Sequence, residues 1–314
     1  MPDEVEVRRT LSEPAARQLA NATKTRAQWS GITPRWLVSF LPWVPVEAGI
    51  FRLNRVKEVE GQSDVECSPS WERDADLPET FVDYETAPRE YFLNAVTTVL
   101  DVQTRVSDLY NQPYDQIQEQ LRLLIEKVKE RQESELIYNA NYGLLTNAAP
   151  SMKINTRRGP PTPDDFDELI AKVWKEPAFF LAHPRAIAAF GRECTQRGVP
   201  PPTINLFGTP FITWRGIPLV PSDKLKITDS GNGTGKTSIL LLRTGEKKQG
   251  VIGLFQPGVP GEVTPSLSVR FMGINRKAIA SYLISLYCSS AILTPDALGV
   301  LENVEVGHYY DYPL

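Results

Sequence analysis

Cysteine and histidine are scarce in this chain, and their scarcity excludes several kinds of site. The three cysteines, Cys67, Cys194 and Cys288, are an odd set without a C-x-x-C pair, so the sequence predicts neither a disulfide framework nor a zinc knuckle. The two histidines, His183 and His308, lie 125 positions apart, so a two-histidine metal site or a Ser/His triad would need both to meet in the fold. We expect free thiols in a reducing cytoplasm and no metal site.

The chain also lacks an excess of charge of either sign. Its 34 lysines and arginines stand against 38 aspartates and glutamates, which gives a net charge of -4. Such a balance provides no electrostatic reason to wrap nucleic acid or to lie on an anionic membrane. We therefore expect the partners of this chain to be proteins.

Long hydrophobic runs are absent, with one exception. The first thirty residues carry charge throughout and contain no secretory signal, so we predict no export. Residues 278–295 are uncharged over eighteen positions, about the minimum for a transmembrane helix. Serines dilute this segment and its side chains alternate in character, which favours a buried strand with two unequal faces over a membrane anchor.

Apolar side chains make up 41% of the 314 residues, enough to build a core, and we expect two linked lobes. Residues 1–25 are polar and predict an arm that needs a neighbour to become ordered. Residues 32–51 are rich in aromatics but interrupted by prolines, which predicts an extended, packed segment. The β-like run from residue 51 leads into a charged stretch up to residue 79, typical of a long protruding hairpin or loop.

Helical periodicity follows in three places. The spacing of apolar residues predicts a first helix over 91–109, ended by the Asn-Gln-Pro breaker at 111–113. A stronger stripe over 117–137 predicts a rod of about 25 residues, roughly 37 Å long. Thr162 as cap and Pro163 at the first helical position, followed by acidic residues, predict a third helix.

Strand signals dominate the rest of the chain. After a short apolar strand, His183 and Pro184 form a corner that leads into a helix over 185–196. Two antiparallel pairs are predicted, one of 211–214 with 217–220 and one of 238–242 with 251–255. The strands expected here are, in order, 178–182, 211–214, 217–220, 238–242, 251–255, 267–272 and 281–293.

Several features imitate functional sites. Gly231–Thr237 looks like a phosphate-binding P-loop, but Ser230 stands where the first glycine is required and a strand-like segment follows instead of a helix. We interpret it as a hairpin loop and keep a P-loop enzyme as an alternative. Asp164, Asp165 and Asp167 resemble an acidic cluster, yet carboxylates are expected at a helix start because they cap it and stabilise its dipole.

The remaining candidates also have structural interpretations. His183, directly before a proline, is interpreted as a corner residue bonded to the backbone. Cys194 lies among apolar neighbours, where a thiol is usually inert. We therefore predict no catalytic, cofactor-binding or metal-ligating residue, and we expect the chain to be a scaffold and not an enzyme.

The order of the predicted elements resembles the α+β, HK97-like fold of phage major capsid proteins. Within that fold, five local sequences are similar to those of the family-two encapsulins, and most similar to the cysteine-desulfurase-associated subtype. The resemblance covers nearly the whole chain after the first ten residues or so, and no stretch is long enough for the cyclic-nucleotide-binding domain of a sister subtype. The five sequences are Glu79–Tyr84, Lys129–Leu136, Trp174–Pro184, Phe211–Gly216 and Val269–Lys277.

The resemblance implies a shell subunit that assembles with copies of itself into an icosahedral nanocompartment in the bacterial cytoplasm. The implied cargo is a cysteine desulfurase that carries its own pyridoxal phosphate, with a role in sulfur metabolism or storage. Pores would pass small solutes; the loops at Gly231–Gly235 and Arg197–Gly198 are the candidates, while cargo-docking residues stay unassigned. The alternative is a phage or prophage capsid protein that packages nucleic acid.

The resemblance also implies a domain organisation. The implied segments are an N-terminal arm and extended segment (1–50), an extended loop (51–87), the helices of a peripheral domain (88–178), an axial domain (179–266) and a C-terminal return to the peripheral domain (267–314).

The arm and the loop are predicted to gain their order from neighbouring subunits. Deleting residues 2–24 should therefore abolish shell closure and leave the two-lobed core folded. Negative-stain microscopy and thermal unfolding of the truncated chain test this. Shells of unchanged size and stability would show that the arm is dispensable.

Overall fold

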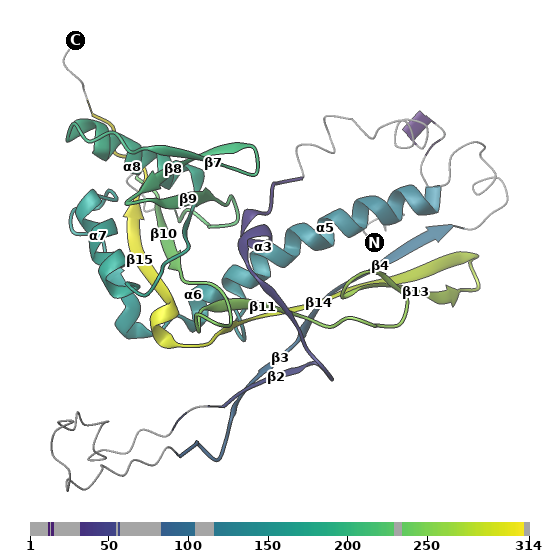
Figure 1. Ribbon diagram of the computed structural model, residues 1–314. Coiled ribbons are helices and arrows are strands. Elements are labelled where there is room, and N and C mark those ends of the chain that lie inside the picture. The colour runs from purple at the N-terminus through teal and green to yellow at the C-terminus, as the bar shows by residue number, and fades with distance from the viewer. Residues whose placement is uncertain are drawn as a thin grey trace, which may run out of the picture.

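The computed structural model describes residues 12, 14–15, 32–54, 56, 83–103, 116–228 and 234–310. A narrow six-stranded sheet extends away from a rounder lobe that is built on a seven-stranded sheet (Figure 1). The helical elements of the described part are α3 (Trp36–Phe40), α5 (Gln116–Tyr138), α6 (Leu144–Asn147), η1 (Pro150–Met152), α7 (Pro163–Lys172), α8 (Pro184–Gln196) and η2 (Pro295–Ala297). Its strands are β1 (Trp43–Pro45), β2 (Ile50–Leu53), β3 (Arg89–Phe92), β4 (Asn94–Gln103), β5 (Lys153–Asn155), β6 (Phe179–Ala182), β7 (Thr203–Leu206), β8 (Thr209–Trp214), β9 (Ile217–Pro221), β10 (Lys236–Leu242), β11 (Val251–Phe255), β12 (Glu262–Thr264), β13 (Leu267–Ile274), β14 (Ile279–Ile292) and β15 (Leu298–Glu305).

Strand β14 is the axis of the narrow sheet. It is 14 residues long and pairs antiparallel with β4, β13 and β11 in the order β1-β11-β14-β13-β12, with β4 added alongside β14. This strand is the uncharged segment that imitates a membrane span, and its pattern of buried positions confirms the predicted strand. In the part of the chain that the structure describes, no helix is long and apolar enough to cross a membrane.

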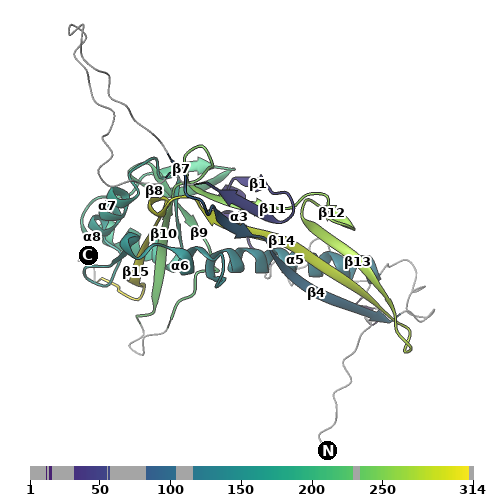
Figure 2. The same cartoon turned by 90° about the horizontal axis from the view of Figure 1, so that it is seen from below.

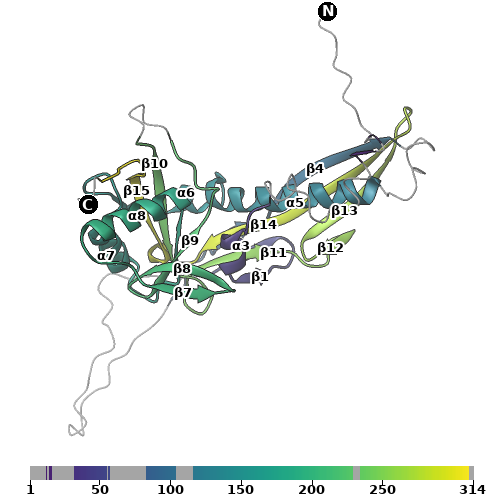
Figure 3. The same ribbon diagram turned by 90° about the horizontal axis from the view of Figure 1, so that it is seen from above.

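Helix α5 lies along one face of the narrow sheet (Figures 2 and 3). Its 23 residues make a rod of about 35 Å, as the apolar stripe predicts. Val128 of α5 packs with Leu267 of β13 and with Ile284 and Leu286 of β14 in one buried cluster. The helix and the sheet therefore bury each other's apolar sides. Both extend well beyond the round lobe (Figure 1).

The seven-stranded sheet has the order β5-β15-β10-β6-β9-β8-β7, and helical elements cover both of its faces. Strand β6 is buried at every position, and its side chains alternate between two cores. Phe179 and Leu181 pack with α3, α6 and the end of α5, whereas Phe180 and Ala182 pack with α7 and α8. Fully apolar strands such as this one are stable only between two covered faces.

The helix starts predicted from capping residues are confirmed. Thr162 Oγ1 accepts a hydrogen bond from Asp165 N at 3.3 Å, and Asp165 Oδ2 accepts one from Thr162 N at 2.9 Å, which completes a capping box. His183 caps α8, because its Nδ1 accepts a hydrogen bond from Arg185 N at 3.0 Å. Pro184 occupies the first helical position, where a missing N–H has no cost.

The hairpin of β8 and β9 is confirmed as predicted. Arg215 and Gly216 both have positive φ, 51° and 83°, as the favoured two-residue hairpin turn requires. Strands β2 and β3 form a separate two-stranded ribbon at the base of the segment 55–82. The predicted protruding loop within that segment lies outside the described residues, as does most of the N-terminal arm.

The helix predicted over 91–109 is wrong in the part that the structure describes. Residues 89–92 and 94–103 are strands β3 and β4, and β4 pairs with β14 over ten positions. Val96, Thr97, Thr98 and Val99 are β-branched, which favours a pleated strand. Their exposure alternates with a period of two, as in a strand. The spacing of the apolar residues in this stretch also fits a helix, so the sequence alone does not distinguish the two.

The predicted pairing of 238–242 with 251–255 is also wrong. Strand β10 lies between β15 and β6 in the wide sheet, whereas β11 lies between β1 and β14 in the narrow one. Both strands are apolar on both faces and need two neighbours each, which a local hairpin does not supply. The predicted series also missed β15, because Gly299, Glu302 and Asn303 interrupt its apolar pattern.

Arg243 joins the two sheets at the point where the chain leaves β10. It is 2% exposed, and its guanidinium donates to Asp296 at 2.9 and 3.1 Å and to Thr294 Oγ1 at 2.7 Å. Asp296 belongs to η2, which links the end of β14 to β15. An ion pair between the buried Arg243 and the half-buried Asp296 therefore connects two of the crossings between the sheets, β10 to β11 and β14 to β15.

Candidate assembly surfaces

The far end of the narrow sheet exposes large apolar side chains. Phe271, Met272 and Ile274 of β13 are 56–61% exposed, and we call these three residues the distal patch. The ring of Phe271 lies 5.4 Å from that of Tyr282 on the paired strand β14, so it is held in place within the subunit. Groups of exposed apolar side chains mark surfaces that meet another molecule.

The round lobe exposes large aromatic side chains as well. Trp174, Phe207 and Tyr309 are 69–78% exposed in the isolated subunit. Phe207 has a φ of 51° in the turn between β7 and β8, a conformation that is unusual for a bulky side chain. Its ring stacks on Trp36 at 6.3 Å and meets Phe40 edge-on at 5.3 Å, so the turn holds an aromatic group outside the core. The molecule therefore carries apolar surface at both ends.

An ion network fixes residues 32–35, where the continuously described part of the chain begins. Thr33 donates to Glu130 of α5 through both its N and its Oγ1, at 2.9 and 2.7 Å. Arg35 donates to Glu126 at 2.8 Å, and Lys224 forms an ion pair with Glu130 at 2.8 Å. Burial raises the pKa of Glu130, but hydrogen bonds from Lys224 and Thr33 outweigh it, so this pKa lies below its ordinary value. The network ties residues 32–35 to both α5 and the loop after β9.

One turn further along α5, Glu133 is buried beside this network. Its Oε1 accepts a hydrogen bond from Ser222 Oγ at 2.6 Å, and its Oε2 has no hydrogen-bond partner among the described residues. Burial raises the pKa of Glu133. The side chain connects α5 to the wide sheet and does not reach the surface.

The P-loop-like sequence does not form a phosphate cradle where the structure describes it. Gly231 to Gly233 lie outside the described residues, while Lys236 and Thr237 belong to β10, which pairs with β15. Lys236 forms an ion pair with Glu305 at 3.7 Å. A strand stands where a P-loop needs a helix N-terminus, which argues against the P-loop alternative. Thr228 and Lys236 form an antiparallel bridge, but the tip of the predicted hairpin loop lies outside the described residues.

The predicted capping role is confirmed for Asp165, whereas Asp167 has a different structural role. Asp165 completes the capping box, and Asp167 accepts hydrogen bonds from Trp214 Nε1 at 2.7 Å and from Arg215. The hydrogen bond from Arg215 lowers the pKa of Asp167. These contacts pin α7 to the β8–β9 turn.

The histidines and the described cysteines also have structural positions. His183 caps α8, whereas His308 contacts Glu305 at 2.5 Å. Cys194 and Cys288 are buried free thiols, and burial raises their pKa values to about 11 and about 12. Across the described ranges, no three metal-binding side chains of His, Cys, Asp or Glu come together.

Of the two predicted pore loops, only one is fully described. Arg197 and Gly198 follow α8, and Gly198 has a φ of 70° that ends the helix. The other loop is described only from Thr234 onward. Both assignments stay predictions.

The sequence analysis missed the apolar surfaces. The distal patch lies within the Val269–Lys277 sequence that resembles the encapsulins, but no role follows from that resemblance. The available signal is the run Phe271-Met272, which breaks the period of two that a half-exposed strand should show. Exposure itself depends on what α5 covers, which the strand's own sequence does not reveal.

Solved structures of low sequence identity share this fold. A chain of Microbacterium phage Oxtober96 matches with a TM-score of 0.59 at 11% identity, over 86% of this chain and 91% of that chain. A virus-like particle from Pyrococcus furiosus matches with a TM-score of 0.51 at 14% identity, over 91% of this chain and 98% of that chain. The chain therefore has the HK97-like fold of phage capsid proteins, as predicted.

Proteins of much higher identity define the family. The family described as "Type 2A encapsulin shell protein SrpI-like" matches residues 51–308. The type 2A encapsulin shell protein SrpI of Synechococcus elongatus is 66% identical over 303 residues, 96% of each protein, and a type 2A encapsulin shell protein of Mycolicibacterium paratuberculosis is 60% identical over 302 residues, again 96% of each. A chain of the holo-SrpI encapsulin complex from S. elongatus, solved by cryo-electron microscopy, matches with a TM-score of 0.80 at 62% identity, over 97% of this chain and 99% of that chain.

The chain belongs to the SrpI-like type 2A encapsulin shell proteins. The resemblance stated from the sequence is thereby confirmed. As a member of this family, the chain is a structural subunit that assembles into a multisubunit, capsid-like cage, and it is not an enzyme. The exposed apolar side chains at the two ends of the molecule are among those available for such contacts.

Proposed function

We propose that this protein closes into an icosahedral shell in the bacterial cytoplasm, that the shell encloses a cysteine desulfurase, and that the compartment serves sulfur metabolism or storage. The observation that carries the proposal is the match to a chain of the holo-SrpI encapsulin complex over 97% of this chain. That match spans both sheets and α5, so the parts that would contact neighbours are common to the two proteins.

The charge of the chain supports a protein cargo. The net charge is -4, and a subunit that packages nucleic acid would be expected to neutralise phosphates with an excess of lysine and arginine. Cys194 and Cys288 are free thiols, which fits a reducing cytoplasm. We expect pyridoxal phosphate to be bound by the enclosed enzyme and not by the shell.

Co-expression tests this proposal. Shells produced together with a cysteine desulfurase from the same bacterium should co-sediment with it and show the absorbance of pyridoxal phosphate. Shells produced from this chain alone should form closed particles in negative stain without that absorbance. Particles that contain nucleic acid and exclude the desulfurase would support the capsid alternative and contradict the proposed cargo.

A further inference from the structure

Helix α5 enters the round lobe at its C-terminal end, and Glu133 lies in this part of the helix (Figure 1). Its carboxylate accepts a hydrogen bond from Ser222 Oγ at 2.6 Å, across 89 positions of the chain. Ser222 begins the loop after β9, and its own N donates at 2.9 Å to the carbonyl of Ala182 at the end of β6. Leu136 and Ile137, in the next turn of α5, are fully buried in the core of the lobe. The contact therefore joins the long helix to the wide sheet.

The carboxyl group of Glu133 is buried without an ion-pair partner among the described residues. The residue is 1% exposed, and its Oε2 has no hydrogen-bond partner in that part of the chain. An ionised carboxylate offers about four acceptor positions, and the hydrogen bond from Ser222 uses one of them. The ammonium group of Lys224 is already paired, with Glu130 at 2.8 Å and with Asp223 at 2.9 Å. An ionised Glu133 would therefore be a poorly compensated buried charge.

The surroundings of Glu133 favour its protonated form. Burial is the largest cause that raises its pKa, and the negative charges of Asp223 and Glu130 raise it further. The hydrogen bond from Ser222 and the positive charge of Lys224 oppose this shift without cancelling it. The proton is therefore bound more tightly than in an exposed glutamate.

The other described segments at this joint carry three more charged or titratable groups, Arg35, His183 and Lys226. Arg35 is paired with two carboxylates of α5 at 2.8 and 3.4 Å. His183 follows β6, and burial lowers its pKa, so it is neutral above its ordinary value of 6.5. Lys226, further along the loop after β9, lies over a tyrosine ring at 4.8 Å from its centre. None of the three forms an ion pair with Glu133 in the described structure.

We propose that Glu133 makes this joint sensitive to protons: in its protonated form it keeps the end of α5 against the loop after β9, and release of the proton to solvent loosens that contact. An ionised carboxylate here lacks hydrogen bonds, and it gains them if the helix and the loop move apart and admit water. Glu133 lies about 25 Å along α5 from the start of the helix at Gln116, so a small movement at the joint becomes larger at the far end of the narrow sheet. The position of the narrow sheet relative to the lobe would then respond to pH in every subunit.

The direction of the effect follows from the raised pKa of Glu133. The folded-state pKa lies above the ordinary value of 4.5, so this proton stabilises the fold fully below 4.5, and the contribution is lost as the pH rises through the folded-state pKa. Glu130, one turn earlier, has the opposite behaviour. Burial raises its pKa, but hydrogen bonds from Lys224 and Thr33 bring it below 4.5, so its contribution is present above that value and is lost as the pH falls.

Hydrogen exchange measured by mass spectrometry on assembled, cargo-free shells between pH 5 and pH 9 tests the proposal. Glu133→Gln keeps the shape of the side chain and an acceptor for Ser222 but cannot ionise, and comparison with the wild type at each pH cancels the intrinsic pH dependence of exchange. For peptides that cover residues 130–138 and 222–228, the ratio of the wild-type rate to the variant rate should rise at least threefold from pH 5 to pH 9. The melting temperature of the wild type should fall relative to that of the variant by at least about 2 °C over the same range.

Glu130→Gln is the matched control, because it makes the same change one turn away on the same helix. Glu130 is ionised throughout this pH range, so the ratio of the wild-type rate to the rate of this variant should stay constant. A constant ratio for Glu133→Gln would contradict the proposal, and an equal change of the ratio for both variants would reduce the effect to the general charge of α5.

If Glu133→Gln shells do not form, Ser222→Ala decides. This variant removes the hydrogen bond that lowers the pKa of Glu133, so the pH at which exchange at the joint accelerates should move upward relative to the wild type. A midpoint that stays at the wild-type pH, or exchange at the joint without a midpoint between pH 5 and pH 9, would show that Glu133 does not control the contact.

Discussion

Replacing Arg243 by methionine is expected to lower the melting temperature of the assembled shell by roughly 3–6 °C. Methionine keeps much of the buried volume but removes the guanidinium that donates to Asp296 and Thr294. The lost charge-assisted hydrogen bonds cost about 2–4 kcal/mol, while Asp296 keeps its ion pair with Lys175 and Thr294 Oγ1 keeps its hydrogen bond to Gln249 O. Because Arg243 connects two of the crossings between the sheets, the loss would act on the whole subunit.

Lys175→Met is the matched control for this variant. Lys175 contacts the same carboxylate, with Nζ 3.1 Å from Asp296 Oδ2, but more than half of its side chain is exposed. An exposed ion pair contributes less than about 1 kcal/mol, so this variant should melt close to the wild type. Calorimetry at equal protein concentration compares the three shells, and equal melting of Arg243→Met and wild type would contradict the role given to Arg243.

The effect of Arg243 should also depend on pH. The hydrogen bond from Arg243 lowers the pKa of Asp296 below its ordinary value of 3.8. A lowered pKa means that the ion pair stabilises the fold above the unfolded-state pKa and loses this contribution as the pH falls through the folded-state pKa. The difference in melting temperature between wild type and Arg243→Met should therefore shrink below about pH 4.

The elements that could be predicted from the sequence are those with local signals. The start of α7 follows from Thr162 and Pro163, and the start of α8 from His183 and Pro184, because a cap and the helix it starts are neighbours in the chain. The stripe on α5 repeats often enough to be recognised without knowing what it packs against. Each of these predictions needs no information from a distant residue.

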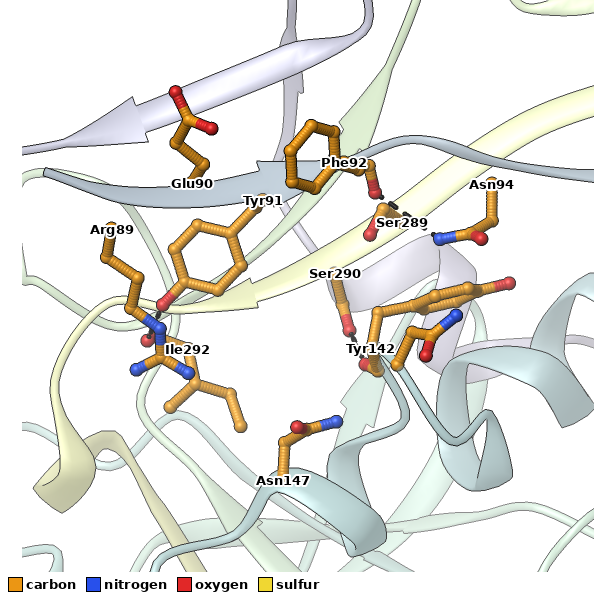
Figure 4. A pocket seen from close by; sticks show the side chains of 11 residues that line it. Arg89, Glu90, Tyr91, Phe92, Asn94, Tyr142, Asn147, Ser289, Ser290 and Ile292 are labelled. Carbon is orange, nitrogen blue, oxygen red and sulfur yellow. Dashed lines mark hydrogen bonds between the residues drawn. The ribbon is translucent and has the colours of Figure 1, made fainter.

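The elements that could not be predicted depend on distant partners. Residues 94–103 become a strand because β14, almost two hundred positions later, pairs with them along their whole length. Strands β10 and β11 do not pair with each other because each pairs with strands of a different sheet. The pocket drawn in Figure 4 has the same origin, since Arg89 and Ser289 in its lining lie on strands far apart in the sequence and meet only in the folded chain.

Replacing Phe271 and Ile274 together by serine is expected to prevent the shell from closing. Each side chain is more than half exposed in the isolated subunit, and burying it against a neighbour would stabilise a contact by about 1–2 kcal/mol. The loss is repeated in every subunit of a closed cage, so a modest change per contact becomes a large change in assembly. Analytical ultracentrifugation should find free subunits or small oligomers where the wild type forms shells.

The adjacent turn provides the control. Arg276 and Lys277 are exposed and charged, and replacing both by serine changes the same end of the molecule without removing apolar surface. These shells should close, because exposed charges contribute little to a contact.

Circular dichroism must show that the Phe271 and Ile274 variant keeps the secondary structure of the wild type, since Phe271 also contacts Tyr282 within the subunit. Normal shells from that variant, with wild-type stability, would show that the distal patch does not lie between subunits and that closure depends on other surfaces, such as Trp174, Phe207 and Tyr309 of the round lobe.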